Sequence, residues 1–177
     1  MRLPFVFALC LAAGPALAEM TLTSPDFADG GTLPTAQVFN AMGCTGGNAS
    51  PALEWSGAPD GTQSFMLTVF DPDAPTGSGW WHWTVANIPA DVTKLPADVT
   101  AATLPAGAVE GRTDFGAPGF GGACPPEGAE PHPYVFTLYA MPEAMLPLDG
   151  NASGAMFGYY ANAMALEHAT LTATFGR

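Results

Sequence analysis

Two apolar segments of strand length, joined by a short acidic loop, constrain the fold of this chain more than any other feature. Residues 64–70 (SFMLTVF) are almost entirely apolar, and residues 83–88 (WTVANI) form a second such segment. An apolar run of this length is typical of a strand buried on both faces, at the centre of a sheet. We therefore expect the two segments to pair. The acids Asp71 and Asp73 follow the first segment, and the aromatic run 80–83 (WWHW) opens the second, so this end of the pair is expected to form the rim of a pocket.

The remaining segments predict further strands, glycine- and proline-rich connections and one late helix. Strands are expected at residues 20–27, 33–39, 52–55, 134–141 and 171–175, and the helix at residues 153–168. Ser153 is a plausible N-cap, and Met156 and Tyr160 are expected on the face that packs against the sheet. His168 is expected at the helix end, where a cation suits the helix dipole. This pattern predicts one mainly β domain over residues 19–177.

The charge balance limits the classes of partner. The chain has sixteen acidic residues against four basic ones, and the basic residues are scattered. Binding to nucleic acid or to an anionic lipid surface requires clustered lysine and arginine. We therefore expect no nucleic-acid partner and no stable membrane insertion, and we interpret the acidity as a solubility feature.

The first eighteen residues resemble a secretory signal peptide rather than part of the domain. Arg2 is followed by an apolar segment, and residues 16–18 (ALA) fit the small-residue rule for cleavage after Ala18. This predicts a periplasmic or secreted protein. Cys44 and Cys124 would then remain, and two cysteines in an exported protein favour a disulfide, with two unpaired buried thiols as the alternative.

Four short motifs, taken in order, resemble the phosphatidylethanolamine-binding protein family. They are DPDAP (71–75), W-x-H (80–82) ahead of a strand ending in NIP, CPP (124–126), and H-x-Y (132–134) at the start of a strand. The likeness extends to the segments CTGGNASPALEW (44–55) and DFGAPGFGGACPP (114–126), and it is greatest to the bacterial branch described as Raf-kinase-inhibitor-like. Kinase inhibition is not carried over, because the loop between Asp73 and Trp80 is shorter than in eukaryotic members.

The resemblance implies a fold and a site. The fold is a large antiparallel sheet with a smaller second sheet and a C-terminal helix. The site is a small pocket for an anionic group, such as phosphate or a phospholipid head group. The residues that match the family motifs are Asp71, Asp73, Trp80, His82, Pro125, Pro126, His132 and Tyr134.

An anion site beside two acids needs a source of positive charge or of hydrogen-bond donors. We expect His82 to lie beside Asp71 and to be protonated there, and the glycine-rich residues 111–126, the glycine loop, to offer backbone N–H groups. Binding would then weaken as pH rises. A protein-interaction module that regulates an envelope or extracellular enzyme through the same rim is the alternative.

Catalysis and metal binding are less favoured by the motifs. Two histidines and two aspartates could hold a metal ion or act as acid–base catalysts, but no recognised metal-ligand spacing, nucleophile elbow or phosphate-binding loop is present. We therefore expect no cofactor, no metal and no enzymatic activity.

Overall fold

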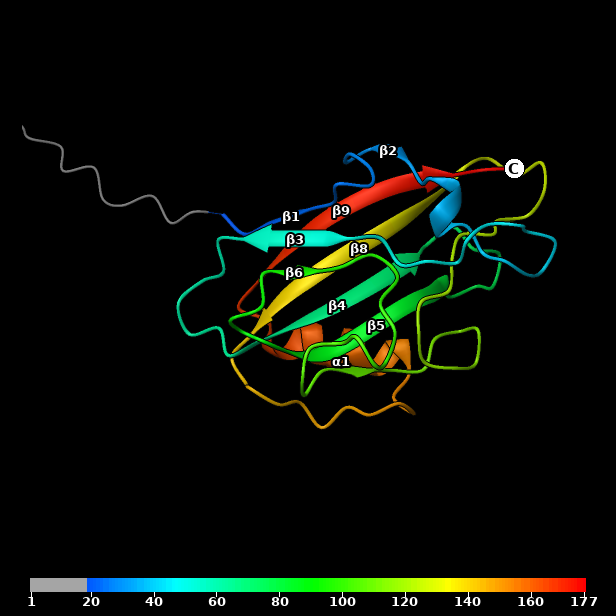
Figure 1. Cartoon of the computed structure of the whole chain (residues 1–177). Helices are drawn as coiled ribbons and strands as arrows, with labels where there is room; N and C mark the ends of the chain where they lie inside the picture. Colours follow the sequence, from blue (N-terminus) through cyan, green and yellow to red (C-terminus); the bar gives the residue numbers. More distant parts are fainter. Residues whose placement is uncertain (1–18) are drawn as a thin grey trace, which may run out of the picture.

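The computed structural model describes residues 19–177, which form two β-sheets and one α-helix in three layers (Figure 1). The proposed signal peptide, residues 1–18, lies outside the described residues. The larger sheet has the strand order β2 (Gly31–Thr32), β9 (Glu167–Phe175), β8 (His132–Met141), β4 (Ser64–Asp71), β5 (Trp80–Pro89) and β7 (Val109–Glu110). Its strands are antiparallel, apart from the parallel pair β2 and β9. The smaller sheet has the order β1 (Thr21–Thr23), β3 (Leu53–Ser56) and β6 (Lys94–Leu95).

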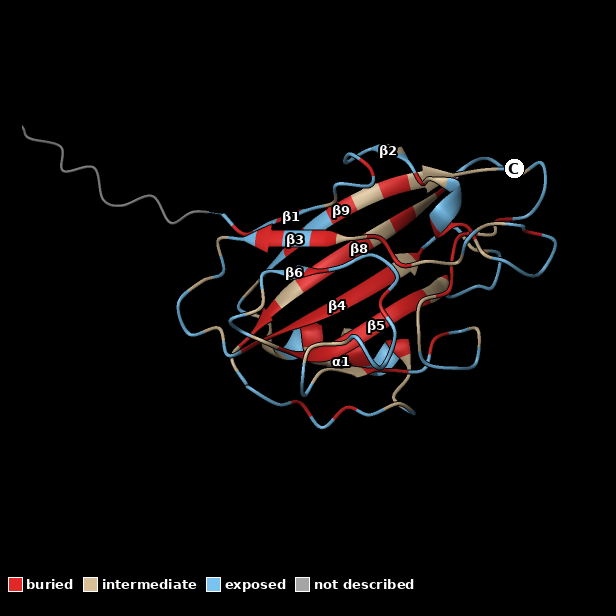
Figure 2. Ribbon diagram, in the orientation of Figure 1, coloured by how far each residue is buried: buried red, intermediate tan, exposed pale blue. Residues whose placement is uncertain are grey.

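The central strand β4 of the larger sheet is buried on both faces, which explains its uninterrupted apolar character. Alternate residues of a strand point to opposite faces. Phe65, Leu67 and Val69 pack in the core between the two sheets, whereas Met66 packs with Phe157 of the helix α1 (Gly154–Met164) in a second core. Figure 2 shows the central strands β4, β5 and β8 mostly buried between these layers. The predicted central hairpin of β4 and β5 is confirmed.

A register shift at the start of β5 decides which side chains reach the end of the sheet. Val69 pairs with Trp83 and Phe70 pairs with Trp81, so His82 has no partner in β4. Such a β-bulge turns the extra side chain toward a new direction. Trp81 therefore packs with Phe70, their ring centroids 4.5 Å apart, whereas His82 turns to the opposite face of the sheet.

Some expected elements differ from the structure. Residues 35–37 form a short 3-10 helix (Thr35–Gln37), not a strand, and β9 begins at Glu167, so His168 lies in a strand instead of at the helix end. Ser153 is the N-cap by position, but its side chain makes no capping hydrogen bond. The helix faces the sheet with Phe157 and Ala161, and Met156 is exposed.

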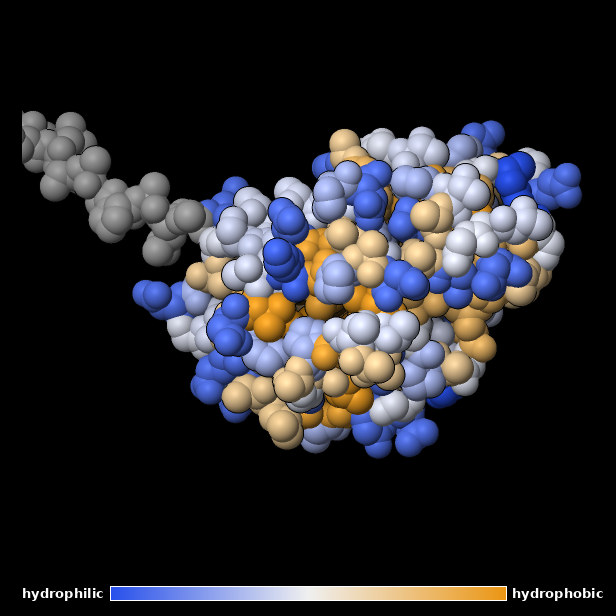
Figure 3. Space-filling model, in the orientation of Figure 1, coloured by the Kyte–Doolittle hydropathy of each residue, from blue (hydrophilic) through white to orange (hydrophobic). Residues whose placement is uncertain are grey.

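The face of residues 19–177 that Figure 3 shows is mixed in character. Figure 3 shows hydrophilic side chains spread over one face, interrupted by smaller apolar areas. None of the helices in this part of the chain is long and apolar enough to cross a membrane.

Candidate functional site

A cavity of about 290 Å³ lies where β4 ends and where β5 and β8 begin. Because β4 is antiparallel to both neighbours, these three strand termini meet at one end of the larger sheet. Of the eight residues predicted from the motifs, seven line the cavity: Asp71, Trp80, His82, Pro125, Pro126, His132 and Tyr134. Asp73 does not line it; this residue is exposed, and its backbone N–H donates to Asp71.

Asp71 is buried, and its two carboxylate oxygens are occupied by protein donors. Oδ1 accepts from the backbone N–H groups of Asp73 (2.9 Å) and Ala74 (3.0 Å). Oδ2 accepts from Nδ1 of His132 at 2.8 Å. A buried carboxylate that is held in this way needs no donor from a ligand. Asp71 therefore orients His132 and closes the turn after β4.

His82 has different partners from those expected. Its Nδ1 donates to the carbonyl oxygen of Gly121 at 2.7 Å, and the imidazole that contacts Asp71 belongs to His132. Burial lowers the pKa of His82, and hydrogen bonds to Gly121 and Gly122 and the charge of Asp71 offset this only in part. The neutral ring with its proton on Nδ1 leaves Nε2 as an acceptor. The expectation of a protonated His82 beside Asp71 is therefore wrong.

Backbone N–H groups of the glycine loop, which were expected to bind an anion, form hydrogen bonds within the protein instead. The N–H groups of Gly121, Gly122 and Ala123 donate to His82 O, Asn48 Oδ1 and Gln37 O, so they are occupied within the protein. A Cβ atom at Gly121 would lie 2.2 Å from the ring of Phe115. Glycine is required there because the loop packs directly on this ring. The loop thus holds His82 and Phe115 in place and does not present these N–H groups to a ligand.

Two residues that line the cavity each carry a buried side-chain donor that has no acceptor in the protein. Five buried side-chain polar atoms in residues 19–177 are unpaired, and two of them, Tyr134 Oη and Trp80 Nε1, belong to lining residues. Burial, followed by the charge of Asp71, raises the pKa of Tyr134 and outweighs the backbone N–H of Cys124, which lowers it, so the phenol keeps its proton and remains a donor. Buried polar groups without partners are rare and costly, which makes these two atoms a functional signal.

Seven further residues line the cavity that the sequence analysis did not assign to the site: Met42, Ala74, Pro75, Thr76, Phe115, Cys124 and Arg177. The ring of Phe115 packs against those of His82 and Trp80, with 5.4 Å between ring centroids in both pairs. Met42 and Arg177 come from segments far from the four motifs in sequence. The glycine-rich composition around Phe115 was the one available signal, because a structured loop of this kind must bury its aromatic side chains.

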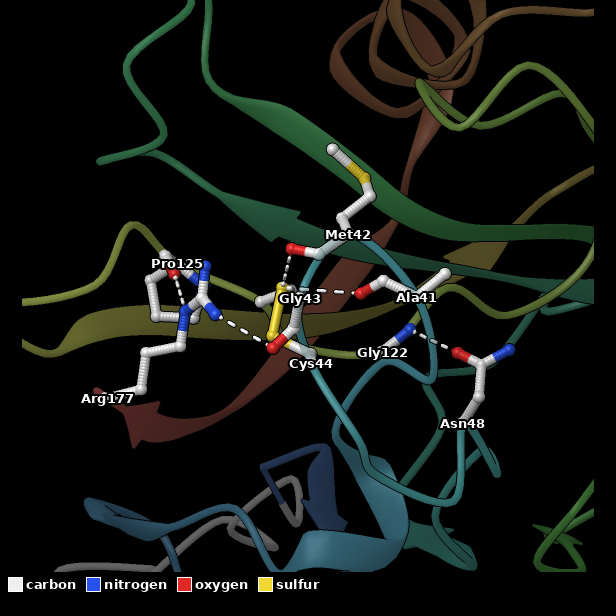
Figure 4. Close-up of a disulfide and its surroundings, with 9 residues drawn as sticks. Ala41, Met42, Gly43, Cys44, Asn48, Gly122, Pro125 and Arg177 are labelled. Atoms are coloured by element: carbon white, nitrogen blue, oxygen red, sulfur yellow. Dashed lines mark hydrogen bonds between the residues drawn. A yellow bond between two sulfur atoms is a disulfide. The ribbon is translucent and has the colours of Figure 1, made fainter.

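A disulfide joins Cys44 to Cys124 beside the cavity (Figure 4), as the sequence favoured. It connects the segment that carries Met42 to the Pro125–Pro126 wall. As for metals, residues 19–177 contain no group of three or more histidine, cysteine or acidic side chains placed to hold an ion.

A sequence profile described as phosphatidylethanolamine-binding protein matches residues 23–176. The chain therefore belongs to the phosphatidylethanolamine-binding protein family, as its motifs indicated, and the expected mainly β fold with two sheets is confirmed.

Individual relatives lie in the bacterial branch. UPF0098 protein YbcL of Escherichia coli is 53% identical over 161 residues, covering 89% of this chain and 88% of the relative. UPF0098 protein YbhB of the same organism is 48% identical over 158 residues, covering 88% and 99%. The crystal structure of E. coli YbcL matches with a TM-score of 0.88 over 90% of this chain and 99% of that chain. A putative lipoprotein of Mycobacterium tuberculosis, LppC, is 37% identical over 161 residues, covering 91% and 74%.

Proposed function

We propose that this protein binds a small anionic group, a phosphate or a phospholipid head group, in the cavity at the ends of β4, β5 and β8. The observation that carries the proposal is the pair of buried, unpartnered donors, Tyr134 Oη and Trp80 Nε1. Each donor needs an acceptor, and an anionic oxygen is the strongest acceptor available. The family's description as phosphatidylethanolamine-binding agrees with a ligand that carries phosphate oxygens.

The other polar groups of the cavity support binding rather than catalysis. Both oxygens of Asp71 are hydrogen-bonded within the protein, so this carboxylate is poorly placed to accept a proton from a substrate. His82 is neutral and held by Gly121, so its charge does not explain anion affinity near neutral pH. Neutral donors at a largely apolar wall orient a ligand without repelling a negative charge.

An exported location is part of the same proposal. The mature protein would begin at Glu19, after cleavage of residues 1–18, and would be periplasmic or secreted. The Cys44–Cys124 disulfide is consistent with an oxidising compartment, and a relative described as a lipoprotein is consistent with the cell envelope. N-terminal sequencing of the protein recovered from its own envelope fraction tests this: Glu19 as the first residue supports export, and an intact Met1 contradicts it.

Isothermal titration calorimetry with glycerol 3-phosphate, inorganic phosphate and the uncharged control glycerol tests the binding proposal. We expect saturable binding of both phosphate compounds and none of glycerol. Native mass spectrometry of the protein purified from its own envelope would show the mass of any natural ligand that remains bound. Failure of both phosphate compounds to bind, together with a ligand-free mass, would contradict the proposed function.

A further inference from the structure

Arg177 brings a permanent positive charge to the cavity. Among the lining residues it is the only lysine or arginine; Lys94 lies on β6, Arg112 follows β7, and neither borders the cavity. The whole chain carries sixteen acids against four bases. Within residues 19–177, the one ion-pair contact within 4.0 Å joins His132 to Asp71, so no carboxylate lies within that distance of this guanidinium.

The protein holds the guanidinium of Arg177 in a fixed position (Figure 4). Its Nε donates to the carbonyl oxygen of Pro125 at 2.6 Å, and its Nη1 donates to that of Gly43 at 3.1 Å. The backbone carbonyl of Arg177 accepts from Gly128 at 2.8 Å. The disulfide ties together the two segments that supply these acceptors, because Gly43 precedes Cys44 and Pro125 follows Cys124. The charge is therefore anchored to a covalently closed frame.

Part of the donor capacity of Arg177 remains unused. A guanidinium has five N–H groups, and the carbonyls of Pro125 and Gly43 occupy two of them. The remaining N–H groups lie on the two terminal nitrogens, the arrangement that matches two oxygens of one phosphate group. Tyr134 and Trp80 are neutral donors, so they respond little to the number of charges on a ligand. Coulomb attraction to Arg177 grows with each ligand charge.

We propose that Arg177 sets the charge preference of the cavity, so that it binds a phosphomonoester more tightly than a phosphodiester. This inference rests on the proposed function, because it assumes that an anionic group enters the cavity. A phosphomonoester carries about two negative charges above pH 7, whereas a phosphodiester carries one. Arg177 is the group that distinguishes the two, and its hold on Pro125 and Gly43 keeps it at the cavity.

Calorimetry with two probes that share a glycerol phosphate unit tests the preference. Glycerol 3-phosphate is the monoester, and glycerophosphoglycerol is the diester, which represents a lipid head group and carries one negative charge. At pH 7.5 and low ionic strength, we expect the wild type to bind the monoester at least tenfold more tightly, with an advantage that shrinks as salt is added. We expect Arg177→Gln to lower monoester affinity at least tenfold and diester affinity less than threefold.

Control variants separate charge from structure. Arg112→Gln makes the same change of net charge away from the cavity, and we expect both affinities to stay within twofold of wild type. Arg177→Lys keeps the positive charge but loses the guanidinium that bonds to the carbonyls of both Pro125 and Gly43. We expect this variant to keep its preference for the monoester but to bind both probes with lower affinity than wild type.

Two results would overturn the role of Arg177 while leaving the proposed function intact: a wild type that binds both probes equally, or an Arg177→Gln variant that loses both affinities by the same factor. The wild-type comparison decides the matter even where a variant does not fold. If neither probe binds the wild type, the proposed function fails and this inference fails with it.

Discussion

Replacement of Tyr134 by phenylalanine should have opposite effects on stability and on binding. The side chain is 2% exposed, and its O–H group finds no acceptor in the protein. In the ligand-free state, the folded protein therefore bears the cost of a buried, unpaired donor. In the bound state, the same hydroxyl donates to the anion. Tyr134→Phe removes both effects and leaves the ring and its packing in place.

The magnitudes follow from general values for such groups. An unpaired buried hydroxyl costs about 1–3 kcal/mol, so we expect the ligand-free variant to be about 1 kcal/mol more stable than wild type. For a protein of this size, this raises the melting temperature by about 2–4 °C. A hydrogen bond to a charged group contributes about 1.5–3 kcal/mol, so we expect ligand affinity to fall by roughly 10- to 150-fold.

Scanning calorimetry of the ligand-free proteins and titration with glycerol 3-phosphate measure the two effects separately. Tyr159→Phe is a matched control, because this tyrosine is 64% exposed on the helix and water solvates its hydroxyl. We expect the control to change neither quantity. A Tyr134→Phe variant that is less stable than wild type, or that binds as tightly, would refute the reasoning, because the hydroxyl would then have a partner other than the ligand.

Three further predictions concern stability. The free energy of unfolding of the Cys44→Ala/Cys124→Ala protein should be about 4.5 kcal/mol lower, since the disulfide closes a loop between residues 80 apart. Scanning calorimetry should show a melting temperature roughly 9–18 °C lower than that of wild type. A decrease of less than about 3 °C would contradict the loop-closure argument. Burial lowers the pKa of His82, so the unfolded chain binds the proton more tightly. Stability should therefore fall as pH drops below about 6.5, by at most about 1.4 kcal/mol per pH unit, and urea unfolding of His82→Gln should show a weaker pH dependence than wild type; an identical dependence would argue against this origin. Gly154→Ala should lower the free energy of unfolding by about 1–3 kcal/mol, because the added methyl would lie 2.1 Å from the indole ring of Trp81. Gly158→Ala, whose methyl would lie 3.7 Å from the same ring, should raise it by about 0.5–1 kcal/mol. Thermal melts that rank the two helix variants in the reverse order would contradict this packing.

The sequence predicted the part of the cavity that depends on strand termini. Asp71, His82 and Tyr134 lie at the ends of apolar runs that are unmistakable in the sequence. Central strands of an antiparallel sheet bring such ends together whatever the connecting loops do. The sequence, with the family resemblance of its motifs, therefore suffices to place the motifs in one pocket.

The partner of each polar group could not be predicted from its motif. Asp71 and His82 are close in sequence, yet the bulge at His82 turns its ring toward Gly121, and His132 from β8 reaches Asp71 instead. A shift of one residue in strand register has no signature in composition. The position of Arg177 is likewise a product of tertiary contacts, because its anchors lie 52 and 134 residues away in the chain.

The start of the helix was predicted correctly, but the helix ends at Met164, and its predicted sheet-facing side is only partly right. Tyr160 packs against the second core as expected, whereas Met156 is exposed, and the hydrophobic side chains that α1 buries are those of Phe157 and Ala161. This segment has no charged residue to mark its outer face, so its hydrophobic pattern is nearly uniform around the axis. Phe157 packs with Met66 in the second core, so Phe157 faces the sheet and its neighbour Met156 faces solvent.

The most direct test of the account is a calorimetric titration of glycerol 3-phosphate into the wild type and the Trp80→Phe/Tyr134→Phe protein. The account predicts one saturable site in the wild type and at least a hundredfold weaker binding in the variant, with the fold preserved by circular dichroism. Equal binding by the two proteins, or none by the wild type, would contradict the claim that these two donors hold an anionic ligand.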